Sequence, residues 1–336
     1  PGMPAFATSP VGTRQVSFDV LALASNGLFS STAAVTAGIH PNVLRGAVRQ
    51  GDVVRLRRGW YALAASRRTP EGWHELRLRA ELASRSHELI ATHDSALVML
   101  GLPVRRDRLD AVHLGRIDSG PTGRRSARDT RAATSGSGAD RAVCVVHQVP
   151  PSARHDRHCV EPAFAVVQLG LDAGPREALV ATDAALRREL ISPSDLTRAV
   201  TAYRRTPGIA QVRTAVAWAD GRAESPGESR LRFLLLRLGY RVEVQAEVSA
   251  GGNTYRADLR VAGSRVLVEY DGLGKHDDPH ELRRERFREA ALRADGWEFA
   301  RFGAADLDVP ELVKRHVDAA LGRGRDALGR EPNERH

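Results

Sequence analysis

The sequence contains few cysteines, almost no lysine and no long apolar run. Its 336 residues include only two cysteines, Cys144 and Cys159, which cannot form a disulfide framework and favour a reducing compartment. No stretch approaches the ~20 apolar residues of a membrane-spanning helix, and no signal-peptide core is present. We therefore expect a cytoplasmic protein that does not act in a membrane.

The basic side chains are nearly all arginine. Of the 50 basic residues only Lys275 and Lys314 are lysine, which leaves 50 − 2 = 48 arginines. The formal net charge of +9 and the pI near 10.4 indicate a polyanionic partner, with nucleic acid ahead of an anionic membrane surface. The length leaves room for two or three domains, each with its own core.

The N-terminal segment predicts a winged helix-turn-helix domain over residues 10–66. Helices are expected at 14–26, from about 31 to 37 and at 41–50, followed by a two-stranded ribbon at 53–63. The last of these helices would meet the major groove of DNA and the ribbon would meet phosphates. The alternative is a small helical domain used for protein contact. The expected DNA-binding residues are Asn42, Arg45, Arg49, Arg57 and Arg58.

Residues 67–221 predict a mixed α/β connector. Apolar spacing indicates helices near 70–86, 93–102, 162–170, 175–190 and 193–204, with strands near 109–114 and 141–149. Residues 118–141 are rich in Gly, Ser and Arg and predict a flexible basic loop. No catalytic group of residues stands out in this part.

Three histidines near the two cysteines raise the question of zinc. His147, His155 and His158 lie between Cys144 and Cys159, but their spacing matches no compact pair of ligands typical of a structural zinc site. We therefore predict no zinc.

Residues 222–321 predict a further α/β domain that begins with a capped helix. Ser225 and Pro226 suit the helix start, and Glu228, three residues after Ser225, suits either a capping box or a catalytic role. A helix at 280–295, a strand at 297–302 and a helix at 311–321 complete this domain. The tail at 322–336 is expected to be disordered.

A predicted hairpin at 255–270 carries three acidic residues on mostly apolar strands. Period-2 alternation places Glu269 and Asp271 on one face, and pairing of the strands brings Asp258 beside them. Such carboxylates repel one another, so a cation should offset them, and oxygen ligands suit Mg²⁺ or Mn²⁺. Simple solvation of an outer sheet face is the alternative.

Two family resemblances add to these patterns. Residues 27–63 resemble the N-terminal winged-helix domain of AbiEi-family antitoxins, and residues 93–220 resemble the middle part of AbiEi-like proteins. The segments ESPGESRLRFLLLRLGY, YRADLR, VLVEYDG and GWEFARF resemble the Vsr-like endonuclease domains of the PD-(D/E)XK superfamily, over about a third of the chain.

The second resemblance implies a restriction-endonuclease-like site. Asp258 matches the metal-binding aspartate at a strand end, Glu269 the acidic member of the E-X-K element and Glu228 the first-helix glutamate. Asp271 stands where the general pattern has lysine, so Lys275, on a glycine-bearing loop, is the expected catalytic lysine and His276 a second candidate for water activation.

The sequence thus predicts a multidomain α/β protein: a winged helix-turn-helix, a connector and a PD-(D/E)XK domain. We expect a Mg²⁺-dependent DNA endonuclease or nickase, in phage defence or mobile-element control, with DNA and a protein partner or second copy as partners. The alternative is a DNA-binding transcriptional regulator or antitoxin whose nuclease fold has lost catalysis. A third hypothesis, a toxin or antitoxin acting by protein contact, depends on neighbouring genes.

Overall fold

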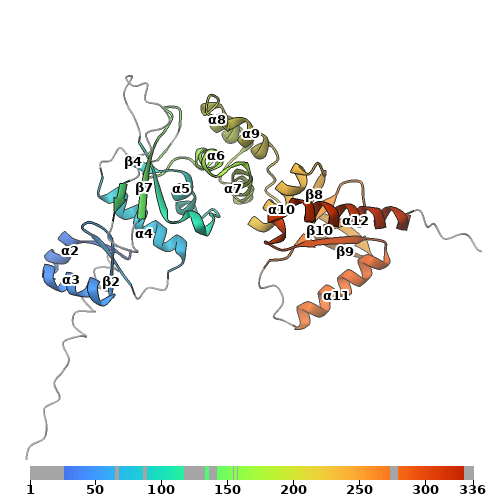
Figure 1. The fold of residues 1–336 in the computed structure, drawn as a ribbon, viewed down its shortest axis with the longest axis horizontal. Coiled ribbons are helices and arrows are strands. Elements are labelled where there is room, and N and C mark those ends of the chain that lie inside the picture. Colours follow the sequence, from blue (N-terminus) through green and yellow to red (C-terminus); the bar gives the residue numbers. More distant parts are fainter. Residues whose placement is uncertain are drawn as a thin grey trace, which may run out of the picture. The chain divides into compact units, whose positions relative to one another are not determined.

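The chain folds into two compact units, Pro1–Ala165 and Val166–His336, which are described separately (Figure 1). The division into three domains, with boundaries at 66/67 and 221/222, stays a prediction. The computed structural model describes residues 26–64, 68–85, 89–116, 133–135, 142–153, 155–156, 158–272 and 279–328.

The first unit begins with a small three-stranded sheet that carries two short helices. Along the chain these elements are β1 (Leu28–Ser30), α2 (Ser31–Thr36), α3 (Pro41–Gln50), β2 (Val53–Arg57) and β3 (Trp60–Leu63). The sheet is antiparallel, with the order β1-β3-β2. Helix α3 starts at a proline, where no backbone donor is lost, and ends at Gly51 in the left-handed conformation (φ 81°).

The rest of the first unit is a four-stranded sheet with helices. Its elements are α4 (Pro70–Ala83), β4 (Leu89–Ala91), α5 (His93–Met99), β5 (Ala111–Arg116), β6 (Ala133–Ser135), β7 (Ala142–Gln148) and the start of α6 (Pro162–Ala173). The strand order is β4-β5-β7-β6, and only the β5–β7 pair is parallel. One side of α4 packs on the small sheet through Leu76 and Ala80, which share a core with Leu28, Leu56 and Ala62.

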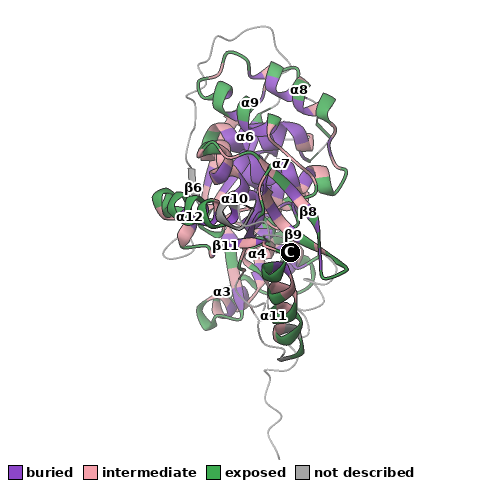
Figure 2. Ribbon diagram, turned by 90° about the vertical axis from the view of Figure 1, so that its right-hand side faces the viewer, coloured by how far each residue is buried: buried purple, intermediate pink, exposed green. Residues whose placement is uncertain are grey.

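Three helices open the second unit ahead of its sheet. They are α7 (Pro175–Arg187), α8 (Pro193–Ala202) and α9 (Ile209–Ala217), followed by α10 (Pro226–Arg237). Much of α6 and α7 is buried, as Figure 2 shows. Helix α7 packs against both α9 and α10, so α10 joins the helical part to the sheet that follows it.

The sheet of the second unit has four strands in the order β11-β10-β9-β8. Along the chain its elements are β8 (Val242–Ala250), β9 (Asn253–Val261), β10 (Val266–Tyr270), α11 (Pro279–Ala294), β11 (Glu298–Phe302) and α12 (Pro310–Leu328). Strands β8, β9 and β10 are antiparallel neighbours, and β11 runs parallel to β10. Helices α10 and α12 cover one face, where Leu231, Leu235, Val313 and Val317 meet Val266 and Val268.

Strands β8 and β9 change face in the middle of their ladder. Leu259 belongs to the core under α10 and α12, whereas Ala257 belongs to the other core with Leu267 and Leu292. In a regular strand residues two apart share a face, so the strand is distorted between them. Gln245, on the paired strand, has a left-handed φ of 51°, and it lies between the pairs Val244–Leu259 and Ala246–Ala257. Asp258 lies at the same point of β9.

The structure corrects two boundaries. Helix α12 continues to Leu328, so the predicted helix end at 321 and disordered tail from 322 are wrong for residues 322–328. The glycines there accept helical φ values, and Arg323 Nε anchors the turn by donating to Glu298 Oε2 at 2.8 Å. Ala133–Ser135, inside the predicted loop 118–141, pairs with β7 as a strand. The predicted helix at 14–26 lies outside the described residues except for Asn26.

Candidate functional sites

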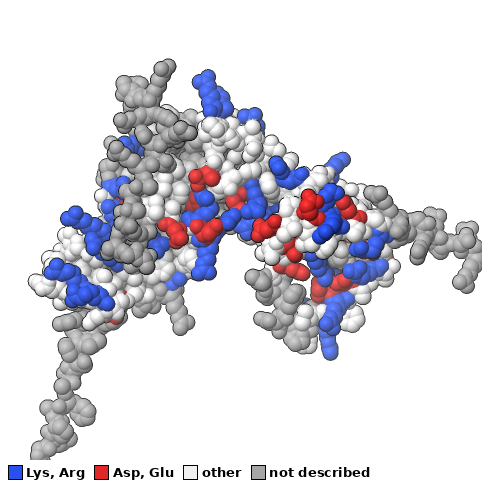
Figure 3. Space-filling model, in the orientation of Figure 1, with Lys and Arg blue, Asp and Glu red and all other residues white. Residues whose placement is uncertain are grey.

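Helix α3 presents an exposed polar face. Asn42, Arg45 and Arg49 are all exposed, while Leu44 and Ala47 on the opposite face are buried in the core of the small sheet. Arg45 Nη2 donates to Asn42 Oδ1, one turn earlier. The helix contains no acidic residue, so its outer face carries two positive charges without a counter-charge of its own. Figure 3 shows basic side chains over this end of the first unit.

The two arginines predicted at the ribbon differ in position. Arg58, in the turn between β2 and β3, is exposed. Arg57 Nη1 instead donates to Glu81 Oε2 of α4 at 2.8 Å, and only 19% of its side chain is exposed. Arg57 therefore holds the ribbon against α4. Arg55 on β2 is exposed and was missed, because alternation along a short strand did not identify its outer face.

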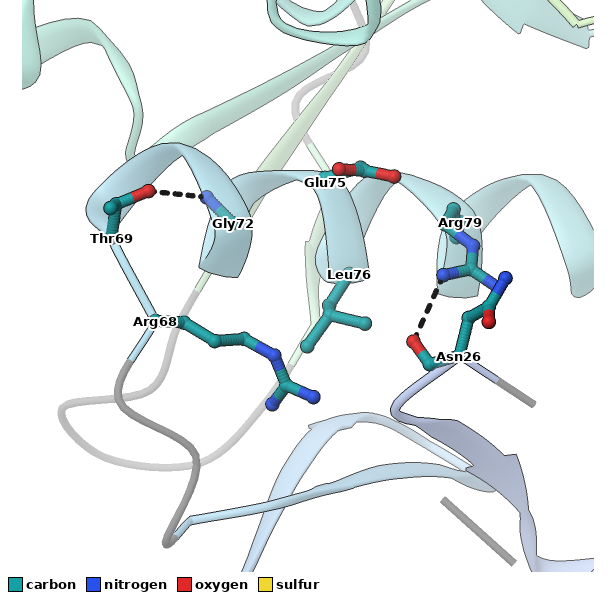
Figure 4. Close-up of a pocket in the computed structure, with 7 residues that line it drawn as sticks. All are labelled: Asn26, Arg68, Thr69, Gly72, Glu75, Leu76 and Arg79. Atoms are coloured by element: carbon teal, nitrogen blue, oxygen red, sulfur yellow. Dashed lines mark hydrogen bonds between the residues drawn. The ribbon is translucent and has the colours of Figure 1, made fainter. Parts of the chain in front are cut away.

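An arginine-lined pocket lies beside the start of α4 (Figure 4). Thr69 caps the helix by accepting from Gly72 N at 3.2 Å, and Arg79 Nη1 donates to the Asn26 carbonyl at 3.1 Å. Burial and then the charge of Arg79 lower the pKa of Arg68. Both arginines line the pocket and add positive charge on this side of the first unit. The lining residues are Asn26, Arg68, Thr69, Gly72, Glu75, Leu76 and Arg79.

The acidic residues predicted in the second unit are only partly brought together. Glu228 Oε2 accepts from Gln245 Nε2 at 2.9 Å and from Glu224 N at 2.8 Å, which ties the first turn of α10 to the distorted point of β8. Asp258 Oδ2 accepts from Tyr270 N at 2.9 Å, at the end of β10. The Ser225 cap is confirmed, but the return bond of Glu228 reaches Glu224 rather than Ser225 as a capping box requires.

Glu269 is buried and paired with two arginines. Its Oε1 accepts from Arg288 Nη2 of α11, and its Oε2 accepts from Arg301 Nε of β11 at 3.0 Å. Both arginines also bind Glu285. Burial by itself would lower the pKa of Arg288, but the hydrogen bonds to Glu285 and Glu269 outweigh it and raise that pKa. Glu269 is thus neutralised by cations of the same chain.

The predicted metal set is not gathered. Among the residues that the structure describes, the oxygens of Asp258, Glu269 and Asp271 do not form a group within 4.8 Å of one another. Asp271 is exposed just beyond β10, and its backbone N donates to Phe302 O at 2.9 Å. Lys275 and His276 lie outside the described residues.

Instead, the described residues gather three histidines in the first unit: His93 on α5, His113 on β5 and His147 on β7. Of the five residues weighed for zinc, His147 alone belongs to this group. His155 and His158 are exposed, and burial raises the pKa of the Cys144 thiol to about 11 and that of Cys159 to about 12. Sequence spacing missed His93 and His113 because they lie far from His147 along the chain.

The small sheet of the first unit carries two short helices, α2 and α3, which precede the two-stranded ribbon β2–β3. Residues 19–64 match the family described as "Transcriptional regulator, AbiEi antitoxin". The N-terminal region is therefore of the AbiEi antitoxin type, as predicted for residues 27–63. The resemblance predicted for residues 93–220 lies outside this match and stays a prediction.

Two relatives and one solved structure extend the comparison. "Uncharacterized protein Rv2248" and "Uncharacterized protein MT2308", from two strains of Mycobacterium tuberculosis, are 30% identical over 175 residues, which is 50% of this chain and 65% of each relative. The crystal structure of the RV2827C protein from Mycobacterium tuberculosis is 14% identical with a TM-score of 0.34, over 63% of this chain and 83% of that one. A likeness at that score does not define a shared fold. None of these matches bears on the predicted Vsr-like domain.

None of the helices in the described ranges has both the length and the apolar character that a membrane span requires.

Proposed function

We propose that this chain is a DNA-binding transcriptional regulator of the AbiEi antitoxin type, which binds duplex DNA with the exposed face of α3. The match of residues 19–64 to that family supports the proposal. The observation that carries it is the uncompensated basic face of α3, formed by Asn42, Arg45 and Arg49. A helix-turn-helix places such a face in the major groove, where arginines bind phosphates or guanine edges.

The ribbon adds to this interface at its turn. Arg58 is exposed and lies where a wing meets the phosphates beside the groove. Arg57, by contrast, is held by Glu81 and contributes to the orientation of the ribbon rather than to DNA contact. The proposed interface is therefore Asn42, Arg45, Arg49 and Arg58.

The test is the salt dependence of duplex binding, measured by fluorescence anisotropy. For Arg45→Ala/Arg49→Ala we expect weaker binding. The slope of the logarithm of the binding constant against the logarithm of the salt concentration should fall in magnitude by roughly 2, about 1 for each lost phosphate contact. The matched control is Arg204→Ala/Arg205→Ala, which removes two exposed arginines after α8 and the same net charge. Equal affinity and equal slope in the wild type and the α3 variant would show that α3 does not contact the DNA.

A second candidate function is Mg²⁺- or Mn²⁺-dependent DNA cleavage by the second unit. It is supported by the element order α10-β8-β9-β10-α11-β11, with β11 parallel to β10, which is the order of a PD-(D/E)XK core. In this proposal Asp258, Glu269 and Asp271 would hold the metal, and Glu228, Lys275 and His276 would serve the attacking water.

The contacts of Glu269 favour the regulator over the nuclease. A metal would have to displace Arg288 and Arg301 from the Glu269 carboxylate, which costs two charge-assisted hydrogen bonds. Supercoiled plasmid incubated with the protein and Mg²⁺ or Mn²⁺ separates the two functions. Nicked or linear product that disappears in Asp258→Ala supports the nuclease, and intact plasmid bound by the protein supports the regulator alone.

A further inference from the structure

The three histidines in the first unit come from three separate elements that converge on one point. His113 and His147 lie on the parallel neighbours β5 and β7, where His147 is opposite Gly115 and therefore two residues along from His113. Residues two apart share a face, so both rings lie on the same side of the sheet. His93, the first residue of α5, has a left-handed φ of 50°, a conformation that non-glycine residues seldom adopt.

The glycine at position 115 of β5 leaves room for α5 to lie close to the sheet. A Cβ added to Gly115 would lie 2.5 Å from Thr92 Cγ2 and 2.3 Å from Val149 Cγ2, so only glycine fits there. Thr92 directly precedes His93. The missing side chain at position 115 therefore allows the start of α5, and the His93 ring with it, to lie close to the two strands.

The ring nitrogens are close enough to share one ligand. His113 Nδ1 and His147 Nε2 lie 2.9 Å apart, and the ring centroids of His93 and His147 are separated by 3.8 Å. One nitrogen from each of the three histidines lies within 4.8 Å of the others. Tetrahedral ligands at about 2.0–2.1 Å from zinc lie roughly 3.3 Å apart, so a bound ion would replace the hydrogen bond between His113 and His147 and turn the stacked rings toward itself.

A fourth buried histidine, His74, is linked to His113 through Ser95. His74 Nδ1 lies 2.9 Å from the Leu109 carbonyl and must donate to it, so His74 Nε2 accepts from Ser95 Oγ, also at 2.9 Å. Both nitrogens of His74 are therefore used within the fold. Ser95 Oγ in turn accepts from the backbone N of His113 at 2.8 Å, which fixes the strand position of that histidine.

Asp94 lies beside the cluster and is paired with Arg108. Its two oxygens accept from Arg108 Nε and Nη2 at 2.9 and 2.8 Å, and Oδ2 lies 3.9 Å from His113 Nε2. This leaves His113 Nδ1 directed toward His147. A carboxylate near the outer nitrogen of a histidine is a common feature around metal-binding histidines, because it orients the ring and raises its basicity.

The donor set of this cluster defines the class of metal that it would bind. Neutral imidazole nitrogens suit Zn²⁺, Co²⁺, Ni²⁺ and Cu²⁺, whereas Mg²⁺ and Ca²⁺ prefer oxygen.

We propose that His93, His113 and His147 bind one transition-metal ion of the zinc class, with the remaining coordination position left to water. This site is separate from the DNA-binding face of α3 and from the acidic residues of the second unit. It revises the expectation of no zinc, which considered His147 with His155, His158 and the cysteines.

The test uses the full chain, stripped of metal with a chelator and then dialysed. Calorimetric titration with Zn²⁺ is expected to show one tight site, and Co²⁺ is expected to give visible d–d absorption from bound nitrogen ligands. In His147→Ala, whose side chain is only partly buried, Zn²⁺ affinity should fall by more than about 100-fold, beyond the 10- to 100-fold typical of losing a second-shell group.

A matched control makes the outcome specific. His158→Ala removes an exposed histidine of the same unit and should change neither the Zn²⁺ affinity nor the Co²⁺ spectrum. His113→Gln repeats the test at a second ligand, with its fold checked by circular dichroism. Absence of Zn²⁺ and Co²⁺ binding in the wild type, or an unchanged affinity and spectrum in folded His147→Ala, would overturn the proposal.

Discussion

A buried ion pair connects α10 to α7 in the second unit. Arg232 Nη2 lies 2.5 Å from Asp183 Oδ2, and the two side chains are 3% and 1% exposed. Asp183 Oδ1 also accepts from Asp220 N at 2.8 Å, and Arg232 Nη1 donates to the Trp218 carbonyl. The pair therefore joins the helical part of the unit to the helix that packs on its sheet.

Removing one partner leaves an uncompensated charge in the core. We expect Arg232→Met, and separately Asp183→Asn, to lower the free energy of unfolding of this unit by about 3–5 kcal/mol each. The double variant leaves neither charge, and the side-chain amide oxygen introduced at position 183 still accepts from Asp220 N. Its loss should therefore be smaller than the sum of the single losses, with a coupling of about 1–3 kcal/mol.

The assay is urea unfolding followed by tryptophan fluorescence. The chain has four tryptophans, and a Trp60→Phe/Trp73→Phe background leaves Trp218 and Trp297, both in the second unit, as reporters. Lys314→Met is the control, because its ion pair with Asp318 on α12 is about half exposed and such pairs contribute little. A single variant with the wild-type midpoint, or a strictly additive double variant, would refute this account.

Three further predictions concern packing and the thiols. Gly227→Ala places a Cβ 2.0 Å from Tyr270 Cε1 and should lower the free energy of unfolding of the second unit by about 1–3 kcal/mol in urea. Gly322→Ala has open space around it and should stabilise α12 by about 0.5–1 kcal/mol, so similar values for the two variants would contradict the packing. Burial raises the pKa of Cys144 to about 11 and that of Cys159 to about 12, against 9.0 for a free thiol. Iodoacetamide at pH 8 should therefore modify both thiols only after unfolding. Rapid labelling of the native protein would show that the thiols are exposed. The folded state holds these protons more tightly than the unfolded state, so the stability of the first unit should fall as pH rises from 9 toward 11.

Periodicity predicted most elements of the fold. The helices beginning at Pro162, Pro175, Pro193 and Pro226 start where proline and apolar spacing placed them, and the β9–β10 hairpin forms as alternation predicted. The strand at residues 89–91 and the helix at residues 209–217 were not predicted. The first is too short to show a period, and the second is apolar on more than one side.

The site residues were predicted less completely, because spacing along the chain does not report convergence between elements. The exposed face of α3 follows from its own helical period, and the structure places Asn42, Arg45 and Arg49 there. The histidine cluster combines one residue from a helix with two from parallel strands 34 positions apart. Only the register of β5 against β7 brings those two together, and no pattern in the sequence specified that register.

The acidic residues of the second unit show the same limit in their charge balance. Mutual repulsion of carboxylates on an apolar hairpin predicted a cation nearby, and a divalent metal was the expected one. For Glu269 the structure supplies Arg288 from α11 and Arg301 from β11 instead. Helix α11 is so rich in charge that its sequence has no apolar stripe to indicate which arginine faces the sheet. Because the chain provides its own cations, carboxylate clustering in an arginine-rich sequence is weak support for a metal until the arginine positions are known.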